Sequence, residues 1–137
     1  MKIVLDTNVW LSGIFWDGKA SKILKRAEKE NIQIIISEDI LSEIVTVLNR
    51  ESKFQKYILN LRLSIENLLR AILSISTLIE TKTKLDIIKV DPKDNIILEA
   101  ALEGKVEYLI SYDNHILNMI EFRNIKIISP KEFLELK

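Results

Sequence analysis

The chain has 137 residues, and its 20 lysines and arginines are balanced by 20 aspartates and glutamates. This length suits a single domain over residues 1–137, because about 100–200 residues is the usual size of a domain with its own core. The sequence has no cysteine and one histidine, which excludes disulfides, zinc fingers, iron–sulfur clusters and multi-histidine metal centres. Three scattered glycines exclude the P-loop and the GxGxxG loop. Any chemistry must therefore come mostly from carboxylates, hydroxyls and amides.

Membrane segments are not expected from the hydropathy of the chain. No apolar run approaches the roughly 18 residues that span a bilayer, and residue 1 leads directly into a strand-like segment rather than a leader-like one. We therefore expect a cytoplasmic protein with no membrane partner.

Short apolar runs alternate with amphipathic stretches along the chain. In chain order, the pattern predicts a strand at 3–5, a helix at 19–30, a strand at 34–36, helices at 38–49, 61–75 and 92–103, a strand at 106–110, a helix at 114–121, a strand at 125–128 and a short helix from Pro130. Residues 76–90 give no clear pattern. Strands this short and apolar are typical of a parallel sheet covered by helices on both faces. The alternation predicts a doubly wound α/β fold.

Polar residues follow the predicted strands, at the edge where open α/β sheets bind ligands. Asp6 follows the first strand, and Ser111, with Asp113 just beyond, follows the third. On the 92–103 helix, a rotation of about 100° per residue places Asp94 inside the apolar arc. Since an unpaired carboxylate facing a core is expensive, Asp94 either has a buried partner or points past the helix start into a site. Glu43 falls at the border of the apolar face of its own helix.

The opposite face of the 92–103 helix carries Glu99 and Glu103, which the same rotation places on the solvated side. Each acid also has a local interpretation. Asp6 is suited to an Asx-turn, Asp91 and Asp94 to an N-cap with a capping-box acid, and Asp113 to a cap of the next helix. Glu43 could be a surface residue.

Taken together, the acids indicate a metal site. Four carboxylates at one edge cannot all ionise unless a cation neutralises them. Oxygen ligands without histidine or cysteine select Mg²⁺ or Mn²⁺, and such ions polarise phosphoryl oxygens and stabilise leaving oxyanions. A phosphodiester is the natural substrate for this arrangement.

Five segments in order resemble the motifs of the PIN-domain family. They are Ile3-Val4-Leu5-Asp6-Thr7-Asn8-Val9, Ser37-Glu38-Asp39-Ile40-Leu41-Ser42-Glu43, Asp91-Pro92-Lys93-Asp94-Asn95, Tyr108-Leu109-Ile110-Ser111-Tyr112-Asp113, and the closing Ile127-Ile128-Ser129-Pro130-Lys131-Glu132-Phe133-Leu134. The match runs from residue 3 to residue 134. The resemblance implies a three-layer α/β/α sandwich with a central, mostly parallel sheet.

The same resemblance implies a Mg²⁺- or Mn²⁺-dependent endoribonuclease, especially the toxin of a prokaryotic toxin–antitoxin pair. It implies an RNA substrate, an antitoxin protein as partner and a homodimer. The family's metal-binding acids match Asp6, Glu43, Asp94 and Asp113, and its supporting positions match Thr7, Asn8, Asn95 and Ser111. In many members a further aspartate follows the fourth acid by two residues. Here that position is His115, so the number of metal ions stays open.

Basic and aromatic residues suggest where RNA binds. Lys22, Lys25, Arg26 and Lys29 form one basic stripe, and Arg50, Lys53, Lys56 and Arg62 form a second cluster. Either set could follow phosphates, or each could be a solvated helix face. Trp10 and Trp16 flank the stretch after the first strand, where an exposed ring could stack on an unpaired base. Packing in the core or in a dimer is the alternative for Trp10.

Two other functions fit part of the sequence. One is a catalytically inactive PIN-like module that binds RNA or protein and retains the acids without using them. The other is a phosphatase with Asp6 as nucleophile, as in the haloacid dehalogenase-like family. That chemistry usually requires a second aspartate two positions on, and this position is Asn8 here.

Overall fold

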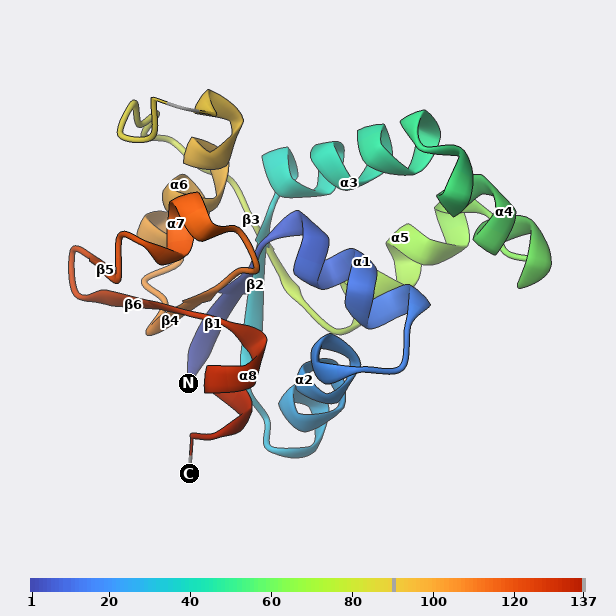
Figure 1. Cartoon of the computed structure of the whole chain (residues 1–137), viewed down its shortest axis with the longest axis horizontal. Helices are drawn as coiled ribbons and strands as arrows, with labels where there is room; N and C mark the ends of the chain where they lie inside the picture. Colours follow the sequence, from blue (N-terminus) through green and yellow to red (C-terminus); the bar gives the residue numbers. More distant parts are fainter. Residues whose placement is uncertain (90, 137) are drawn as a thin grey trace.

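The computed structural model describes residues 1–89 and 91–136, and it contains a six-stranded sheet (Figure 1). The strands are β1 (Lys2–Leu5), β2 (Gln33–Ser37), β3 (Thr77–Ile79), β4 (Tyr108–Ile110), β5 (Glu121–Phe122) and β6 (Ile125–Ile128), in the order β3-β2-β1-β4-β6-β5. All neighbours pair in parallel except β5 and β6. The mostly parallel α/β sheet that the sequence predicts is confirmed, and β3 and β5 add an edge strand on each side.

Helices cover both faces of this sheet (Figure 1). They are α1 (Thr7–Phe15), α2 (Lys19–Lys29), α3 (Glu38–Arg50), α4 (Ser52–Asn60), α5 (Ile65–Ser74), the 3₁₀ turn η1 (Pro92–Asp94), α6 (Asn95–Glu103), α7 (Asn114–Leu117) and α8 (Pro130–Leu134). Helix α6 packs against β1, β2 and β4, whereas α2 packs against α1 and α8. No helix in the described part of the chain is long and apolar enough to cross a membrane.

The core explains why the strands are so apolar. Ile3, Val4 and Leu5 in β1 are fully buried, as are the side chains of β2 that follow Gln33. A central strand of a parallel sheet has helices on both faces, so both sets of alternating side chains are apolar. Trp10 on α1 is also fully buried, which confirms its expected place in the core.

Two helices were not predicted from the sequence. Helix α1 begins at Thr7, one residue after β1 ends. Four of its nine residues are buried and most of the others are apolar or small, so it lacks a polar stripe that would reveal a helical period. The helix expected at 61–75 begins only at Ile65, because Ser64 and Asn67 form a reciprocal capping box. The second helix that was not predicted is α4, which ends at Asn60, and residues 61–64 form the turn between α4 and α5. Helix α7 ends at Leu117, and the chain turns through Ile120, whose φ is 67°, into β5.

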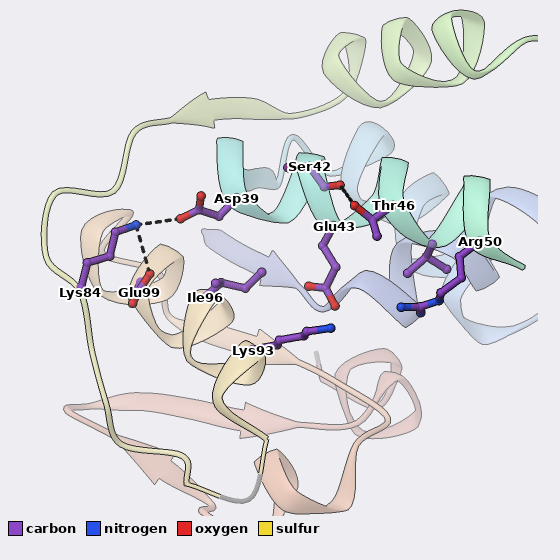
Figure 2. A pocket seen from close by; sticks show the side chains of 10 residues that line it. Asp39, Ser42, Glu43, Thr46, Arg50, Lys84, Lys93, Ile96 and Glu99 are labelled. Atoms are coloured by element: carbon purple, nitrogen blue, oxygen red, sulfur yellow. Dashed lines mark hydrogen bonds and ion pairs between the residues drawn. The ribbon is translucent and has the colours of Figure 1, made fainter.

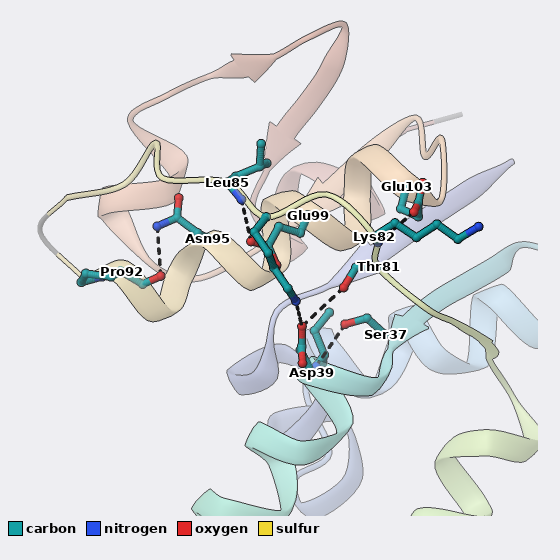
Figure 3. Close-up of polar contacts among 11 residues, drawn as sticks. Ser37, Asp39, Thr81, Lys82, Leu85, Pro92, Asn95, Glu99 and Glu103 are labelled. Carbon is teal, nitrogen blue, oxygen red and sulfur yellow. Dashed lines mark hydrogen bonds and ion pairs between the residues drawn. The ribbon is translucent and has the colours of Figure 1, made fainter.

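Residues 80–89, which we call the strap, cross over α6 without regular secondary structure (Figure 3). Three α6 side chains one turn apart accept backbone N–H groups of the strap. Asn95 accepts from Ile87 and Ile88, Glu99 from Leu85, and Glu103 from Lys82, at 2.8–3.0 Å.

The strap corrects the expectation that Glu99 faces solvent. Glu99 is only 5% exposed, because the strap covers the face of α6 that carries it. The Lys84 ammonium lies 2.9 Å from Asp39 and 3.7 Å from Glu99 and compensates both charges. A helix wheel identifies which side chains share a face, but only the tertiary fold determines whether another segment covers that face.

Candidate functional site

A cavity of about 500 Å³ opens beside the carboxyl ends of β1 and β4. Its lining includes six carboxylates: Glu51, which pairs with Arg50 and Lys53, and a group of five formed by Asp6, Glu43, Asp91, Asp94 and Asp113. The structure thus brings together all four acids that the sequence singled out, and adds Asp91. The crossover connections of a parallel sheet explain this convergence, because they return each strand in the same direction and collect the strand ends at one edge.

Asp6 is fixed by the two strands that meet beside it. Leu5 pairs with Ile110, so the residues that follow these strands, Asp6 and Ser111, are neighbours. The Ser111 hydroxyl donates to Asp6 Oδ2 at 2.9 Å, and the Thr7 backbone N–H donates to Oδ1 at 2.8 Å. Burial raises the pKa of Asp6, and the charges of Asp113 and Asp91 raise it further, while the two hydrogen bonds lower it.

Asp113 is held at the start of α7. Its Oδ1 accepts the backbone N–H of His115 at 2.8 Å, and its own N–H donates to Ser111 Oγ at 2.9 Å. The cap that the sequence suggested for Asp113 is therefore present. The cap uses Oδ1, and Asp113 also lines the cavity.

Glu43 reaches the site from the second turn of α3, which begins immediately after β2 because Ser37 caps it. The Thr7 hydroxyl donates to Glu43 Oε2 at 3.2 Å. Burial raises the pKa of Glu43, and the charges of Asp6 and Asp91 add to this effect. The Thr7 hydrogen bond and the Lys93 charge oppose it.

Asp94 is the least compensated acid of the group. Its Oδ2 is buried and has no hydrogen-bond partner, and its side chain does not cap α6. Burial, followed by the charges of Asp113, Asp6, Asp91 and Glu43, raises the pKa of Asp94 to about 7. Of the two arrangements expected for this residue, a buried hydrogen-bond partner is not found among the described residues, and Asp94 lines the cavity instead.

The acids surround a space rather than a single point. Among residues 1–89 and 91–136, no three histidine, aspartate or glutamate side chains are close enough together to form a ready metal-binding group. The chemistry of the lining nevertheless suits a hard divalent cation. The donors are carboxylate oxygens, and one of them, Asp94 Oδ2, is buried without a hydrogen-bond partner. Burial, together with the neighbouring negative charges, raises the pKa of Asp94.

The four supporting positions differ in what they contact. Thr7 and Ser111 donate directly to Glu43 and Asp6, and Asn8 is exposed and lines the cavity. Asn95 is buried and makes no hydrogen bond to an acid. Its amide instead donates to the carbonyls of Ile88 and Pro92 at 2.9 and 3.0 Å, so it connects the strap to the first residue of the η1 turn.

Asp91 is the site residue that sequence reasoning did not identify. It caps η1 by accepting the Lys93 N–H at 3.3 Å, as its local pattern indicated, and it also lines the cavity. The spacing of three residues between Asp91 and Asp94, across a proline, was the available signal. His115 is exposed and does not line the cavity.

The two basic clusters lie differently with respect to the acids. Arg50 and Lys53 line the acidic cavity, whereas Lys22, Lys25 and Lys29 are exposed on α2 outside its lining. Arg26 is committed to α8: its guanidinium donates to the carbonyls of Phe133 and Leu136 at 2.9 and 3.1 Å.

A second cavity of about 440 Å³ adjoins the first along α3. The two share Glu43, Val47 and Arg50 in their linings. Figure 2 shows Lys84 between Asp39 and Glu99 at one end of this second cavity, and Glu43 with Lys93 and Arg50 at the other. Positive side chains thus lie beside the acidic site.

Comparisons with known proteins agree with this architecture. The family model described as PIN domain matches residues 2–115. No curated protein matches the chain. One similar solved structure is that of VapBC2 from Rickettsia felis bound to a DNA fragment from the VapBC2 promoter. A chain of it superposes on this protein with a TM-score of 0.65 and 18% identity, covering 94% of this chain and 98% of that one.

A second solved structure, PAE2754 from Pyrobaculum aerophilum, superposes with a TM-score of 0.60 and 15% identity, covering 98% of this chain and 87% of that one. At these identities the two structures show a shared fold. The family model covers most of the sequence, and its match includes all four candidate acids. The chain therefore belongs to the PIN domain family, whose members are generally nucleases.

Proposed function

We propose that this protein is a Mg²⁺- or Mn²⁺-dependent endoribonuclease whose metal is held by Asp6, Glu43, Asp94 and Asp113. The observation that carries the proposal is the state of Asp94, whose Oδ2 is buried without a partner among other acids. A carboxylate in that environment is stabilised by a cation. Folded proteins leave few buried polar atoms unpaired, and such exceptions often mark functional positions.

The four acids would have different roles. Asp6, Asp94 and Asp113 would be the principal ligands, and Glu43 would bind the metal or orient the attacking water. A bound divalent ion would supply charge for the phosphoryl oxygen and the leaving oxygen. Ser111 keeps Asp6 in place, and Thr7 keeps Glu43 in place, through the hydrogen bonds described above. No side chain has to form a covalent intermediate.

A nucleic-acid substrate is supported by the charges around the site. Arg50 and Lys53 line the same cavity as the acids, and Lys93 lies beside Glu43 in the adjoining one (Figure 2). Positive side chains bind the phosphate backbone of a nucleic acid, and a metal ion stabilises the charge on the phosphodiester that is cleaved. The family resemblance supports RNA as the substrate.

We further propose that the chain is the toxin of a toxin–antitoxin pair, with an antitoxin protein as partner, and that it forms a homodimer. This part rests on the ordered motifs and on a fold shared with a chain of VapBC2.

Cleavage of a mixed single-stranded RNA panel tests the nuclease proposal. Wild type should cut in Mg²⁺ or Mn²⁺ and not in EDTA, and Asp94→Asn should lose activity by two orders of magnitude or more. Asp86→Asn is the matched control, since Asp86 is exposed on the strap and outside the cavity. Cleavage that survives both EDTA and Asp94→Asn would come from a contaminating enzyme. Metal-dependent cleavage that Asp94→Asn retains in full, or no cleavage by folded wild type in either metal, would contradict the proposal.

An inactive binding module is the second candidate. It is favoured by the spacing of the acids, which form no ready group of three in the described part of the chain. Metal binding separates the two functions, because a module with unused acids should bind no divalent ion through Asp94.

A further inference from the structure

Trp16 is a large apolar side chain that remains exposed beside the acidic site. It follows the last residue of α1, is 41% exposed, and lines the same cavity as the four acids. Trp10, two turns earlier on the same helix, is fully buried. The core therefore accounts for one tryptophan and leaves the other at the edge of the cavity.

Aromatic neighbours hold the Trp16 ring without stacking on it. Phe15, Phe54 and Tyr57 lie 6.3, 6.1 and 5.5 Å from it between ring centroids, at interplanar angles of 67°, 61° and 85°. Edge-on contacts of this kind fix the orientation of a ring. None of the three rings lies parallel to the indole, so a parallel planar group is the type of contact that it does not yet have.

A positive side chain lies over the same ring. The Lys53 ammonium lies 6.0 Å from the Trp16 centroid, and Lys53 and Arg50 both line the cavity. Their ion pairs with Glu51, at 3.8 and 3.9 Å between charged atoms, are long and exposed. Such pairs are weak, so either cation can exchange Glu51 for a phosphate at little cost.

We propose that Trp16 stacks on an unpaired nucleobase of the RNA, next to the phosphate held by Arg50 and Lys53. This proposal rests on the nuclease function and adds a residue that recognises the substrate, namely Trp16 as the contact for an unpaired base. A base inside a duplex is stacked on both faces, so neither face is available to the indole. An unpaired base has a free face on which the indole can stack. Stacking is tolerant of sequence, so Trp16 selects for strandedness rather than for one particular base.

Tryptophan fluorescence tests the contact directly, because the chain has two tryptophans and only Trp16 is exposed. The titrations use metal-free protein in EDTA, so that nothing is cut. Three probes carry similar phosphate charge: a single-stranded RNA, an abasic strand of equal length, and a duplex of half that length. We expect quenching with the single strand, and little with the duplex or the abasic strand.

Two variants make the test independent of quenching alone. Trp16→Leu should weaken binding of the single strand by about tenfold while leaving abasic binding unchanged, since stacking on an aromatic side chain is worth about that much. Trp16→Phe retains a ring and should recover part of the loss. Urea unfolding of each variant establishes that it is folded, and the ring-retaining variant remains informative if Trp16→Leu is not.

The contradicting outcomes are separate from a failure of the nuclease. Equal quenching by abasic and base-bearing strands, no quenching by a strand that binds, or no binding at all would each overturn the stacking contact. Unchanged RNA binding by Trp16→Leu, together with a loss of self-association in the ultracentrifuge, would assign this surface to protein contact instead. Base-dependent quenching without any cleavage in Mg²⁺ would support the stacking of Trp16 on a base and would contradict the proposed nuclease function.

Discussion

The Ser111 hydroxyl, fully buried after β4, donates a hydrogen bond of 2.9 Å to Asp6 Oδ2 at the end of β1. Ser111 Oγ also accepts the backbone N–H of Asp113 at 2.9 Å. One serine therefore connects the two acids that lie nearest the centre of the sheet. Strands β1 and β4 pair in parallel, and the residues that follow them are joined by this serine at the edge of the cavity.

Replacing Ser111 with alanine should lower stability and activity together. The change leaves the Asp113 N–H without its acceptor and Asp6 without its donor, which should cost about 1–3 kcal/mol. Loss of the donor should also raise the pKa of Asp6 further, since the Ser111 bond lowers it. The cleavage rate should fall, and its dependence on pH should move to higher pH.

The matched control is Ser129→Ala, which removes the N-cap of α8 away from the acidic cavity. Loss of a cap should destabilise the fold by about 1 kcal/mol with unchanged cleavage by the folded protein. Equal loss of activity in the two variants, measured below their unfolding temperatures, would show that Ser111 acts through stability alone.

The raised pKa of Asp94 predicts a specific pH dependence of the metal-free protein. Between the ordinary value of 3.8 and the folded value of about 7, the folded state holds a proton that the unfolded chain has released. The contribution of Asp94 to stability is therefore greatest below pH 3.8 and is lost as the pH rises towards 7.

Urea unfolding in EDTA from pH 4 to pH 8 measures this effect. The stability of Asp94→Asn should exceed that of wild type by an amount that grows with pH and levels off above about 7. Asp6 and Glu43 also have raised pKa values, so a smaller decline should remain in the variant. A wild-type-to-variant difference that does not change with pH would contradict the burial and repulsion assigned to Asp94.

Asn95 should be the most sensitive contact of the strap. Its side chain makes four hydrogen bonds, to Ile87, Ile88 and Pro92, and it directly follows Asp94. Asn95→Ala should destabilise the protein by about 2–4 kcal/mol, because several buried polar groups lose their partners. Cleavage should also fall, since the η1 turn that carries Asp94 is no longer fixed.

Glu103→Gln provides the comparison for Asn95, because Glu103 is exposed and holds one strap N–H. It should change stability by less than about 0.5 kcal/mol. Hydrogen exchange of the strap amides separates the effects: Asn95→Ala should release protection at 87 and 88, whereas Glu103→Gln, whose amide oxygen can still accept the Lys82 N–H, should leave exchange along the strap unchanged. Unchanged exchange at 87 and 88 would exclude the clamping role of Asn95.

The position of the basic residues predicts which of them bind RNA. Arg50→Ala and Lys53→Ala should each weaken single-strand binding and reduce the slope of log affinity against log salt by about 0.7, the value for one phosphate contact. Lys22→Ala and Lys25→Ala lie outside the cavity and should have smaller effects. Filter binding from 50 to 300 mM salt gives the slopes, and a larger effect on α2 would place the RNA on that helix.

The sequence predicts the parts of this fold in which local pattern and tertiary environment agree. β1 and β2 are buried on both faces, so their composition alone reveals them. Asp94 could be assigned because helix phase placed a charge where a core residue belongs. The four acids could be grouped because parallel strands bring their ends to one edge.

Other features depend on contacts that the sequence does not encode locally. Glu99 has the position of a solvated residue on its helix, and only the strap, at residues 80–89, makes it buried. Helix α1 has no polar stripe because α2 and α3 cover it. Asp91 has an obvious local role as a cap, and its second role in the cavity follows only from the path of the η1 turn.

Calorimetric titration of Mn²⁺ into protein purified free of bound partners tests the central claim, that the four acids together bind a divalent metal. Wild type and Asp86→Asn should bind alike, with release of protons near neutral pH because the pKa of Asp94 is raised to about 7. Asp94→Asn should bind at least about tenfold more weakly. No binding by folded wild type, or equal binding by Asp94→Asn, would contradict the claim that this cavity is a metal centre.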